Sequence, residues 1–336
     1  KPALGDALGL DFENRPNPDV ANEPDAPLLP VDNSGFTGRV IVNGNWAVRF
    51  RGGINDPDAT PGTGDETPYF NTDLPNAIFE MADAGAWAGK RGSDPNQTIR
   101  LGGVEGVAGS RLQAAIAGDG EALADVTYQL GGANQNAVFF GNVIDGNATD
   151  TVSVTKVGNN IQSFNGANTY SGTTTINSGT LRVNGTHTMD ETLLIPVGDY
   201  TVNAGGTLGG IGTIGSASDP VNIINNGGTI APGESVGTLS VHGNVTFGTG
   251  AGLNIEVDGA NADRLAVTGN IDLSALGNVL NVTGNGSGSW VIATYTGTLT
   301  GTFESVTSGI SVTYGSGQIM ISGTLSAAGL PGDYNN

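Results

Sequence analysis

The sequence contains no cysteine. Disulfide bonds, thiolate metal sites and a cysteine nucleophile are therefore excluded. Histidine is nearly absent as well, with 2 residues among 336. A histidine-based metal site or a serine–histidine catalytic pair would have to use His187 or His242. We expect both to face solvent, because each lies in a strand or turn context rich in Thr, Gly and Asn.

Basic residues are also scarce. The chain has 12 Lys and Arg against 32 Asp and Glu, a formal net charge of -20. Nucleic acids and anionic membranes bind to basic surfaces, so neither is an expected partner. No apolar run approaches the length of a transmembrane helix, and membrane insertion is not expected. The chain starts at Lys1 without a signal peptide, as expected of a mature or trimmed product.

Glycine, in contrast, is abundant, at 56 of 336 residues. Glycine at this level is expected at turns where the backbone needs a positive φ. The hydrophobic content of 37% is too high for a disordered acidic segment. From Thr173 onward, short segments such as residues 253–257 and 279–282 alternate apolar and polar residues between turns. This pattern predicts strands, and stretches with a helical period are almost absent.

A short phrase recurs in the second half of the chain. Among its occurrences, Gly-Thr-Leu or Gly-Thr-Ile has its glycine at positions 179, 206, 228 and 237, so the first two steps in this series are 27 and 22 residues. Such steps are typical of a solenoid, in which each strand buries its apolar face by stacking on neighbouring coils. An antiparallel sandwich is the alternative, but it gives no reason for a repeated phrase. The predicted fold is all-β, a parallel β-helix (solenoid) with an extended Pro-rich N-terminal arm.

The composition divides the chain into four parts. Residues 1–34 form the Pro-rich arm, residues 35–125 an irregular β-rich part or cap, residues 126–325 the β-helix repeats and residues 326–336 a tail. Prolines this dense prevent helix and interrupt strand ladders, so we expect the arm to be extended. We predict that the arm mediates assembly, through Pro16, Pro18, Pro24, Pro27, Leu28, Leu29 and Pro30.

Three local features are expected in the cap. Residues 39–42 and 46–50 are β-rich and flank an Asn-Gly-Asn turn, which predicts a hairpin or tight turn. Residues 52–76 form a long loop full of Gly, Pro and Asp, and loops of this length are often functional or interfacial. Residues 111–123 carry Ala, Leu and Ile at mixed spacing, compatible with one short helix.

The repeat segments resemble a known family. Residues 166–181, 206–214 and 228–239 are similar to the passenger-associated repeat of autotransporter-type surface proteins, and residues 262–269 and 301–314 match its downstream pattern. The resemblance covers roughly residues 126–325 and extends only loosely to the N-terminal third. It implies a right-handed parallel β-helix that is secreted and displayed outside the cell, with an adhesive or structural role and no defined catalytic site.

The end of the chain departs from that family pattern. Residues 330–336 resemble the start of a dockerin-like calcium loop or sorting tail, of the kind that follows such helices in planctomycete proteins. Calcium would be held there by Asp333 and Asn335, together with ligands beyond the end of this sequence. No other cofactor is expected.

Two sequence motifs of enzymes occur in the repeats, and both are interpreted as turns. Residues 233–237 fit the G-x-S-x-G elbow around Ser235, and residues 210–215 fit the G-x-G-x-x-G dinucleotide loop. Each motif requires a helix after it. A strand-like segment follows the first motif and a turn follows the second.

Aromatic and charged residues leave other interpretations open. Asp258, Asp263 and Arg264 are interpreted as turn formers and a local ion pair. No spacing singles out a carboxylate pair for glycoside hydrolysis. Three tryptophans are candidates for stacking on sugars, although such residues more often fill a core or cap a stack: Trp46, Trp87 and Trp290.

These observations lead to three functional hypotheses. The first is a non-catalytic extracellular structural protein whose subunits assemble head to tail, through the arm, into a cell-surface fibre or matrix. The second is a monomeric adhesin that binds glycans or surfaces. The third, a β-helical polysaccharide lyase or hydrolase, is the weakest, because its groove needs clustered basic residues and only 12 are present. We therefore expect no enzyme activity, with copies of the chain and surface glycans as partners.

Overall fold

The structure is a computed structural model that describes residues 8–10, 35–42, 47–51, 69–70, 74–91, 97–114, 125–146 and 149–326. Every regular element in these ranges is a β-strand, and none is a helix. The predicted all-β class and the parallel β-solenoid are confirmed. The handedness of the coil stays a prediction.

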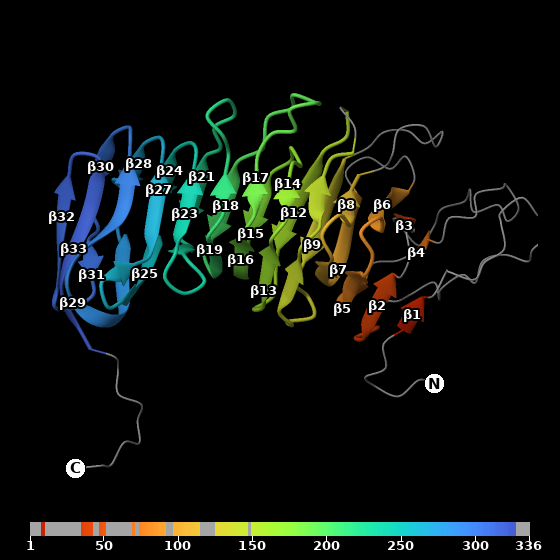
Figure 1. Cartoon of the computed structure of the whole chain (residues 1–336), viewed down its shortest axis with the longest axis horizontal. Coiled ribbons are helices and arrows are strands. Elements are labelled where there is room, and N and C mark those ends of the chain that lie inside the picture. The colour runs from red at the N-terminus through yellow and green to blue at the C-terminus, as the bar shows by residue number, and fades with distance from the viewer. Residues whose placement is uncertain are drawn as a thin grey trace, which may run out of the picture. The chain divides into compact units, whose positions relative to one another are not determined.

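The strands are short and follow one another closely along the chain (Figure 1). The first fourteen are β1 Leu8–Leu10, β2 Arg39–Val42, β3 Ala47–Arg51, β4 Tyr69–Phe70, β5 Leu74–Met81, β6 Trp87–Arg91, β7 Gln97–Gly106, β8 Arg111–Gln113, β9 Val126–Leu130, β10 Ala137–Phe139, β11 Asn142–Ile144, β12 Val152–Lys156, β13 Ile161–Phe164 and β14 Ala167–Asn168. The next ten are β15 Thr174–Ile176, β16 Gly179–Val183, β17 Thr186–His187, β18 Tyr200–Asn203, β19 Gly206–Gly210, β20 Thr213–Ile214, β21 Ile223–Asn226, β22 Thr229–Pro232, β23 Thr238–Val241 and β24 Val245–Phe247. The last nine are β25 Gly252–Asp258, β26 Asn261–Ala262, β27 Arg264–Val267, β28 Ile271–Leu273, β29 Val279–Tyr295, β30 Leu299–Gly301, β31 Ser305–Val306, β32 Ile310–Gly315 and β33 Gln318–Leu325.

The chain divides into two compact units. Unit 1 comprises Lys1–Thr174 and His187–Gly198, and unit 2 comprises Thr175–Thr186 and Asp199–Asn336. The same pairing rule operates inside each unit. In unit 1, β9 pairs in parallel with β12, and β10 with β13. In unit 2, β18 pairs with β21, β19 with β22 and β20 with β23. Because each strand pairs with the third strand after it, three strands make one coil.

The repeated phrase lies in register. In unit 2, Thr180 pairs with Thr207 and Thr207 with Thr229, so three of the four Gly-Thr phrases stack directly. The fourth phrase lies in another sheet of the coil, where Thr238 pairs with Arg264. The spacing of the phrase along the sequence therefore equals the length of one coil only for the phrases that begin at Gly179, Gly206 and Gly228.

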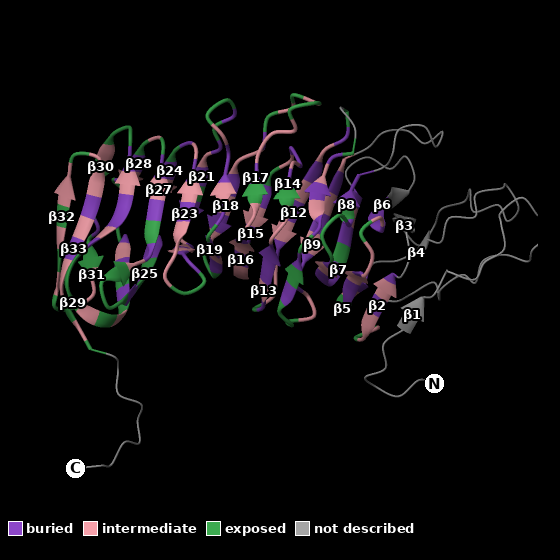
Figure 2. Cartoon of the chain, viewed as in Figure 1, coloured by how far each residue is buried: buried purple, intermediate pink, exposed green. Residues whose placement is uncertain are grey.

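Stacked apolar side chains form the core. In unit 2, Leu181, Leu208, Ile230, Leu253 and Leu280 follow one another in register, and each is at most 1% exposed. Burying one such side chain contributes about 1.5–3 kcal/mol to folding. Figure 2 shows how buried and less buried positions alternate along the strands, as expected where one face of each strand is covered.

Glycine is required where the coil of unit 2 turns from one sheet into the next. Gly205 and Gly227 have φ values of 90° and 78° and immediately precede two of the stacked Gly-Thr phrases. A residue with a Cβ atom is strained at such φ values, which explains why a second glycine precedes each of these two phrases.

Asparagine side chains link successive coils of unit 2 at one corner. Asp199 Oδ1 accepts from the Asn222 amide at 2.9 Å, Asn222 Oδ1 from Asn244 Nδ2 at 3.0 Å, Asn244 Oδ1 from the Asn270 amide at 2.9 Å, and Asn270 Oδ1 from the Thr298 amide at 2.7 Å. The steps are 23, 22, 26 and 28 residues, so the coils differ in length although the ladder is continuous. Part of the additional length lies in the longer strands β25, of 7 residues, and β29, of 17 residues.

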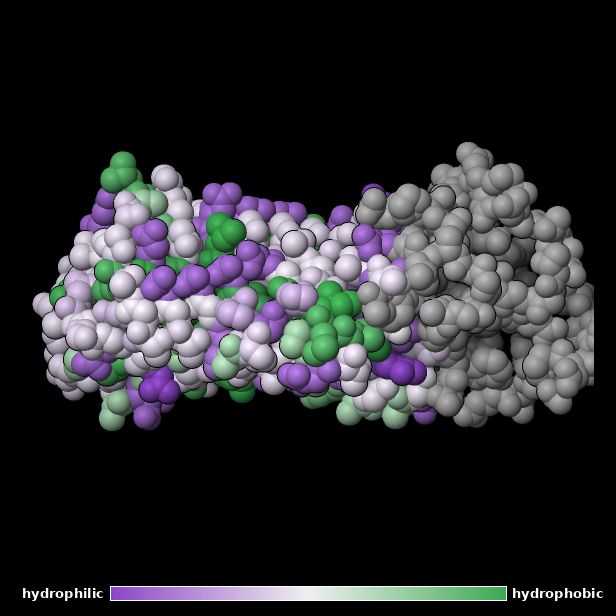
Figure 3. Space-filling model, turned by 90° about the horizontal axis from the view of Figure 1, so that it is seen from above, coloured by the Kyte–Doolittle hydropathy of each residue, from purple (hydrophilic) through white to green (hydrophobic). Residues whose placement is uncertain are grey.

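In unit 1, residues 188–198 form a long loop after β17. Asp190 Oδ1 accepts from the Thr192 amide at 2.8 Å and fixes the start of this loop. Leu194 lies in the loop with a φ of 55° and is 65% exposed. On the face seen in Figure 3, hydrophobic side chains form one larger patch and several smaller spots, and paler or hydrophilic side chains cover much of the described remainder.

Two local predictions in residues 35–125 are wrong. β2 and β3 do not form a hairpin, because β2 pairs in parallel with β5 and β3 pairs in parallel with β6, in a different sheet. β2 and β3 thus belong to two different sheets of the coil. The described start of the predicted helix, residues 111–113, is strand β8, which pairs with β6 because the coil continues there.

The expected long loop of residues 52–76 contains strand β4 and the start of β5, and its remaining residues lie outside the described ranges. The parallel coils also begin earlier than predicted for the repeat region. Within unit 1, β2, β5 and β7 already stack in parallel.

Candidate functional site

The candidate site is a hollow of about 530 Å³ in unit 2. Three segments from successive coils line it, residues 236–238, 260–262 and 289–291. Thr238, Asn261 and Ser289 contribute neutral polar side chains, and Trp290 contributes its indole edge. A site of this composition suits a neutral polar ligand better than a charged one.

The hollow exists because a regular coil is interrupted. After β25 the chain turns back at Gly259, whose φ is 59°, and β26 pairs antiparallel with the end of β25. β29 instead runs straight on, and its pairing with β27 begins only at Ala293, opposite Leu265. The coil of β25 to β27 and the following coil, which contains β29, therefore form no ladder pairs between Gly259 and Leu265. Residues 289–291 border the opening at this place.

A buried carboxylate supports one wall of the hollow. Asp263 is 4% exposed, its Oδ1 accepts from the Gly237 amide at 2.8 Å, and its Oδ2 accepts from the Glu256 amide at 2.8 Å. Burial raises the pKa of Asp263 to about 6, and the charge of Glu256 acts in the same direction. The sequence suggested that Asp263 forms a local ion pair with Arg264. In the structure, both carboxylate oxygens of Asp263 instead accept hydrogen bonds from backbone amides of other coil segments.

Both described tryptophans are largely buried, and Trp290 lines the hollow. Trp290 is 5% exposed, and its Nε1 donates to the Gly259 carbonyl at 3.2 Å. Trp87, in β6 of unit 1, is 9% exposed. Neither presents a free ring face of the size that sugar stacking needs. Trp46 lies outside the described residues.

The two enzyme-like motifs lack their structural context. Ser235 is exposed between β22 and β23, so a strand follows the G-x-S-x-G segment. The G-x-G-x-x-G segment spans the end of β19 and β20, and the chain then turns, with the Ser216 amide donating to the Asp219 carbonyl at 2.9 Å. The interpretation as a turn holds for the first segment, whereas the second consists of the end of β19, a short bend and β20.

The expectation that both histidines face solvent is wrong for His187. This residue of unit 1 is 1% exposed and stacks on Tyr170, with ring centroids 3.8 Å apart. Its Nε2 lies 2.8 Å from the Tyr170 carbonyl oxygen, and burial lowers the pKa of His187 to about 4. The inward position follows from strand alternation, because the preceding residue, Thr186, is exposed. His242 is half-buried, with Nδ1 3.4 Å from Thr268 Oγ1.

Sequence reasoning missed two buried charges in unit 1. Asp145 is 1% exposed and accepts from the amides of Val152 at 2.8 Å and Ser171 at 3.0 Å, while burial raises its pKa. Lys156 is fully buried, its Nζ donates to Asn160 Oδ1 at 3.0 Å, and burial lowers its pKa to about 8. The signal for Lys156 was its place in the alternation of β12, where it follows two inward valines at two-residue spacing.

No cluster of three metal-binding side chains occurs among the residues that the structure describes. The candidate calcium ligands Asp333 and Asn335 lie outside those residues, as do the proposed assembly residues of the arm. Of the arm, only β1 is described, and it pairs in parallel with β2. The described segments also contain no helix of the length and hydrophobicity needed to cross a membrane.

Comparison with known proteins supports the repeat. The Passenger-associated-transport-repeat model matches residues 154–183. A curated relative, an extracellular serine protease of Serratia marcescens, is 32% identical over 114 residues, which are 34% of this chain and 10% of that protein. The chain thus spans about a tenth of the length of the curated relative that it matches. The predicted resemblance to an autotransporter passenger repeat is confirmed, and the chain is a passenger-like β-helix.

Proposed function

We propose that this protein is a non-catalytic structural subunit of the cell exterior, which assembles end to end into a fibre or matrix through the last coil of unit 2 and the N-terminal arm. The passenger repeat supports an extracellular location, since such repeats accompany transported passengers. The extracellular serine protease of Serratia marcescens supports the same location.

The observation that carries the proposal is the uncovered last coil of unit 2. Ile271 pairs with Leu299, and Leu280 with Val306. The inner partners Ile271 and Leu280 are 1% and 0% exposed, whereas Leu299 and Val306 are only half-buried. Up to residue 326, no described strand pairs with the far edges of β30 and β31. Such an edge is a template for another strand, and β1 shows that the arm can add a strand in parallel to a coil.

The test compares two substitutions of exposed or half-exposed leucines in unit 2. Leu299→Lys places a charge on the uncovered coil, and Leu276→Lys is the matched control, because Leu276 is 70% exposed and outside any strand. We expect electron micrographs to show filaments of the parent protein and of Leu276→Lys but not of Leu299→Lys. Deletion of residues 1–34 should also abolish filaments and leave the β-type circular dichroism unchanged. Filaments that persist in both the Leu299→Lys and the deletion variants would contradict the proposal.

The absence of catalysis is part of the proposal. Asp263, which follows the lining residue Ala262, accepts hydrogen bonds from two backbone amides. Incubation with acidic and neutral polysaccharides should therefore release no new chain ends. Any turnover above a buffer control would require a different function.

The hollow favours a second candidate, a monomeric adhesin that binds glycans. Thr238, Asn261 and Ser289 offer neutral hydrogen-bonding groups on three successive coils, as a sugar with several hydroxyls requires. A glycan array should then give signals that Asn261→Ala and Ser289→Ala remove and that Asn254→Ala, on the same unit away from the hollow, retains. A single monomeric species with such signals would favour this function over the fibre.

A further inference from the structure

An exposed apolar patch lies on the outer face of unit 1. Val107, Val138 and Phe140 are 41%, 39% and 52% exposed, whereas Phe139, between the last two, is fully buried. Val138 and Phe140 point to the same side because alternate residues of a strand share a face. The Phe140 amide donates to the Gly106 carbonyl at 2.9 Å, which places Phe140 beside Val107 of the neighbouring coil. We call these three residues the lateral patch.

The fold of unit 1 does not require apolar side chains at outward-facing positions such as those of the lateral patch. The half-buried positions that alternate with the inward residues of β9 and β12 are polar, namely Thr127, Gln129, Ser153 and Thr155. The chain thus tolerates polar residues on its outer faces. Single exposed apolar residues are ordinary, but three that lie close together on two neighbouring coils mark an interaction surface.

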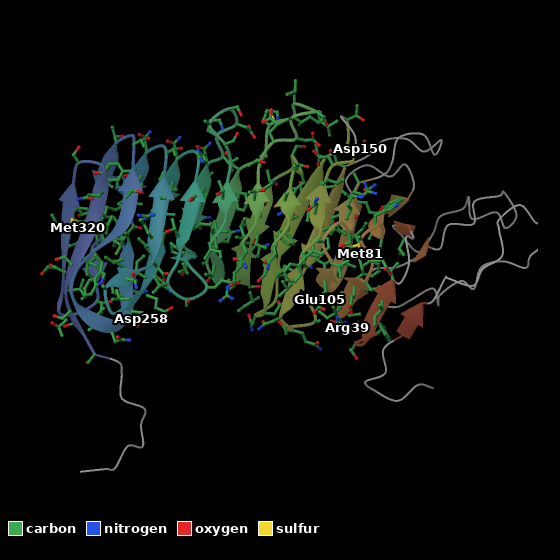
Figure 4. The ribbon with its side chains drawn as sticks, viewed as in Figure 1. Arg39, Met81, Glu105, Asp150, Asp258 and Met320 are labelled. Carbon is green, nitrogen blue, oxygen red and sulfur yellow. The ribbon has the colours of Figure 1, made fainter. Side chains whose placement is uncertain are left out.

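A charged cluster adjoins the lateral patch. Arg39 Nη1 donates to Glu80 Oε2 at 2.7 Å, and the same guanidinium contacts Glu105, with Nη2 3.2 Å from Glu105 Oε1 (Figure 4). Since Gly106 pairs with Phe139, Glu105 lies beside Val138 in the ladder. Arg39, Glu80 and Glu105 therefore extend the lateral patch across the strands toward the N-terminal coils. The cluster has one cation and two carboxylates, so it carries both signs of charge.

We propose that the lateral patch and this cluster form the interface between two copies of the chain, related by a two-fold axis. An axis that lies in the interface and runs across the strands brings the patch of one copy onto the patch of the other. The same axis places each cluster on its counterpart, where Arg39 of one copy faces the glutamates of the other. A surface that carries both an apolar centre and both charges is self-complementary in this sense.

Other occupants fit this surface less well. An anionic membrane is repelled by the two glutamates and by the net charge of -20. A strongly basic protein would place like charge against Arg39, whereas a second copy offers both signs of charge to the cluster. The contact uses a sheet face of unit 1, so it is independent of the end-to-end contact proposed above for the last coil of unit 2.

The first experiment is sedimentation equilibrium of the full chain over a range of concentrations. We expect a monomer–dimer equilibrium, and Phe140→Ser should raise the dimer dissociation constant at least tenfold, because it removes the largest apolar group of the interface. Ile224→Ser is the matched control, since Ile224 is 42% exposed in β21 of unit 2, and it should leave the constant unchanged. Circular dichroism and thermal melting verify that the outward substitution leaves the fold intact.

The second experiment uses the absence of cysteine from the chain. A single cysteine introduced by Val138→Cys should give a covalent dimer with a short bis-maleimide, whereas Ile224→Cys should not. Leu299→Lys should retain this dimer even if it prevents filaments, which separates the two proposals. A chain that stays monomeric at all concentrations, or a dimer that Phe140→Ser leaves unaffected, would overturn the lateral interface.

Discussion

Asp263 and His187 are buried ionisable residues whose environments both disfavour the charged form. The pKa of Asp263 is raised to about 6 and that of His187 is lowered to about 4, in each case chiefly by burial. The two shifts have opposite consequences for stability as the pH changes, because the neutral form of an acid is protonated and that of histidine is deprotonated.

Asp263 should make the protein less stable as the pH rises. A carboxyl whose pKa is raised on folding stabilises the fold below its unfolded pKa of 3.8, and this contribution is lost as the pH rises toward about 6. Asp263→Asn should remove this slope in urea unfolding between pH 4 and about 6. It should also cost roughly 1–3 kcal/mol at pH 7, since an amide N–H then faces the Glu256 N–H. Asp258→Asn, at an exposed position, is the control, and an unchanged slope in Asp263→Asn would contradict the assignment.

His187 should make the protein less stable as the pH falls. A histidine whose pKa is lowered on folding contributes stability above its unfolded pKa of 6.5, and this is lost as the pH falls toward about 4. His187→Phe keeps an aromatic ring against Tyr170 and removes the proton-binding site. Its unfolding free energy should vary less than that of the parent over this window. Equal pH dependence of the two proteins, measured by urea unfolding, would show that His187 does not titrate there.

At the scale of the elements, stability depends on the stacked rows of inward side chains. Leu208→Ala leaves a cavity between Leu181 and Ile230, which are its register partners in unit 2, and should cost about 2–5 kcal/mol. Ile211→Ala, one strand end away and 50% exposed, should change stability by less than about 0.5 kcal/mol. Urea unfolding of both variants measures the difference, and similar values would be inconsistent with a packed row.

The elements also show what a single sequence can and cannot predict. The stacking of Thr180, Thr207 and Thr229 follows from the repeated phrase, because residues at equal places in successive coils must have similar side chains. The Asn-Gly sequence between the segments of β2 and β3 suggested a hairpin, but Asn-Gly is a signal for tight turns in general and does not say which strands pair. The pairing that excludes the hairpin joins β2 to β5, about forty residues along the chain, and leaves no local signal.

The candidate site was beyond sequence reasoning for a similar reason. Trp290 was recognised as a candidate, but the hollow around it depends on how far β29 runs before it pairs with β27. Asp145 and Asp263 look like ordinary turn acids until the coils are stacked. Their partners are then backbone amides up to 26 residues away, a distance set by coil length.

For the whole molecule, net charge sets the balance between solubility and association. The charge of -20 opposes contact between copies, while the proposed interfaces gain from apolar burial. Screening lengths shorten to about 10 Å at 0.1 M salt. Raising the ionic strength from 10 mM to about 0.3 M should therefore increase association, as measured by light scattering. Association that weakens with salt would indicate interfaces held mainly by ion pairs.

The unequal coil lengths of unit 2 have a consequence for how such a chain can change. Steps of 22 and 28 residues join the same ladder of hydrogen bonds, so the length of a coil can change elsewhere while the ladder at this corner stays continuous. Within a strand, one added residue would turn every inward side chain outward. The connections between strands are thus permissive for grafted peptides, and new surfaces can be acquired there while the scaffold keeps its register.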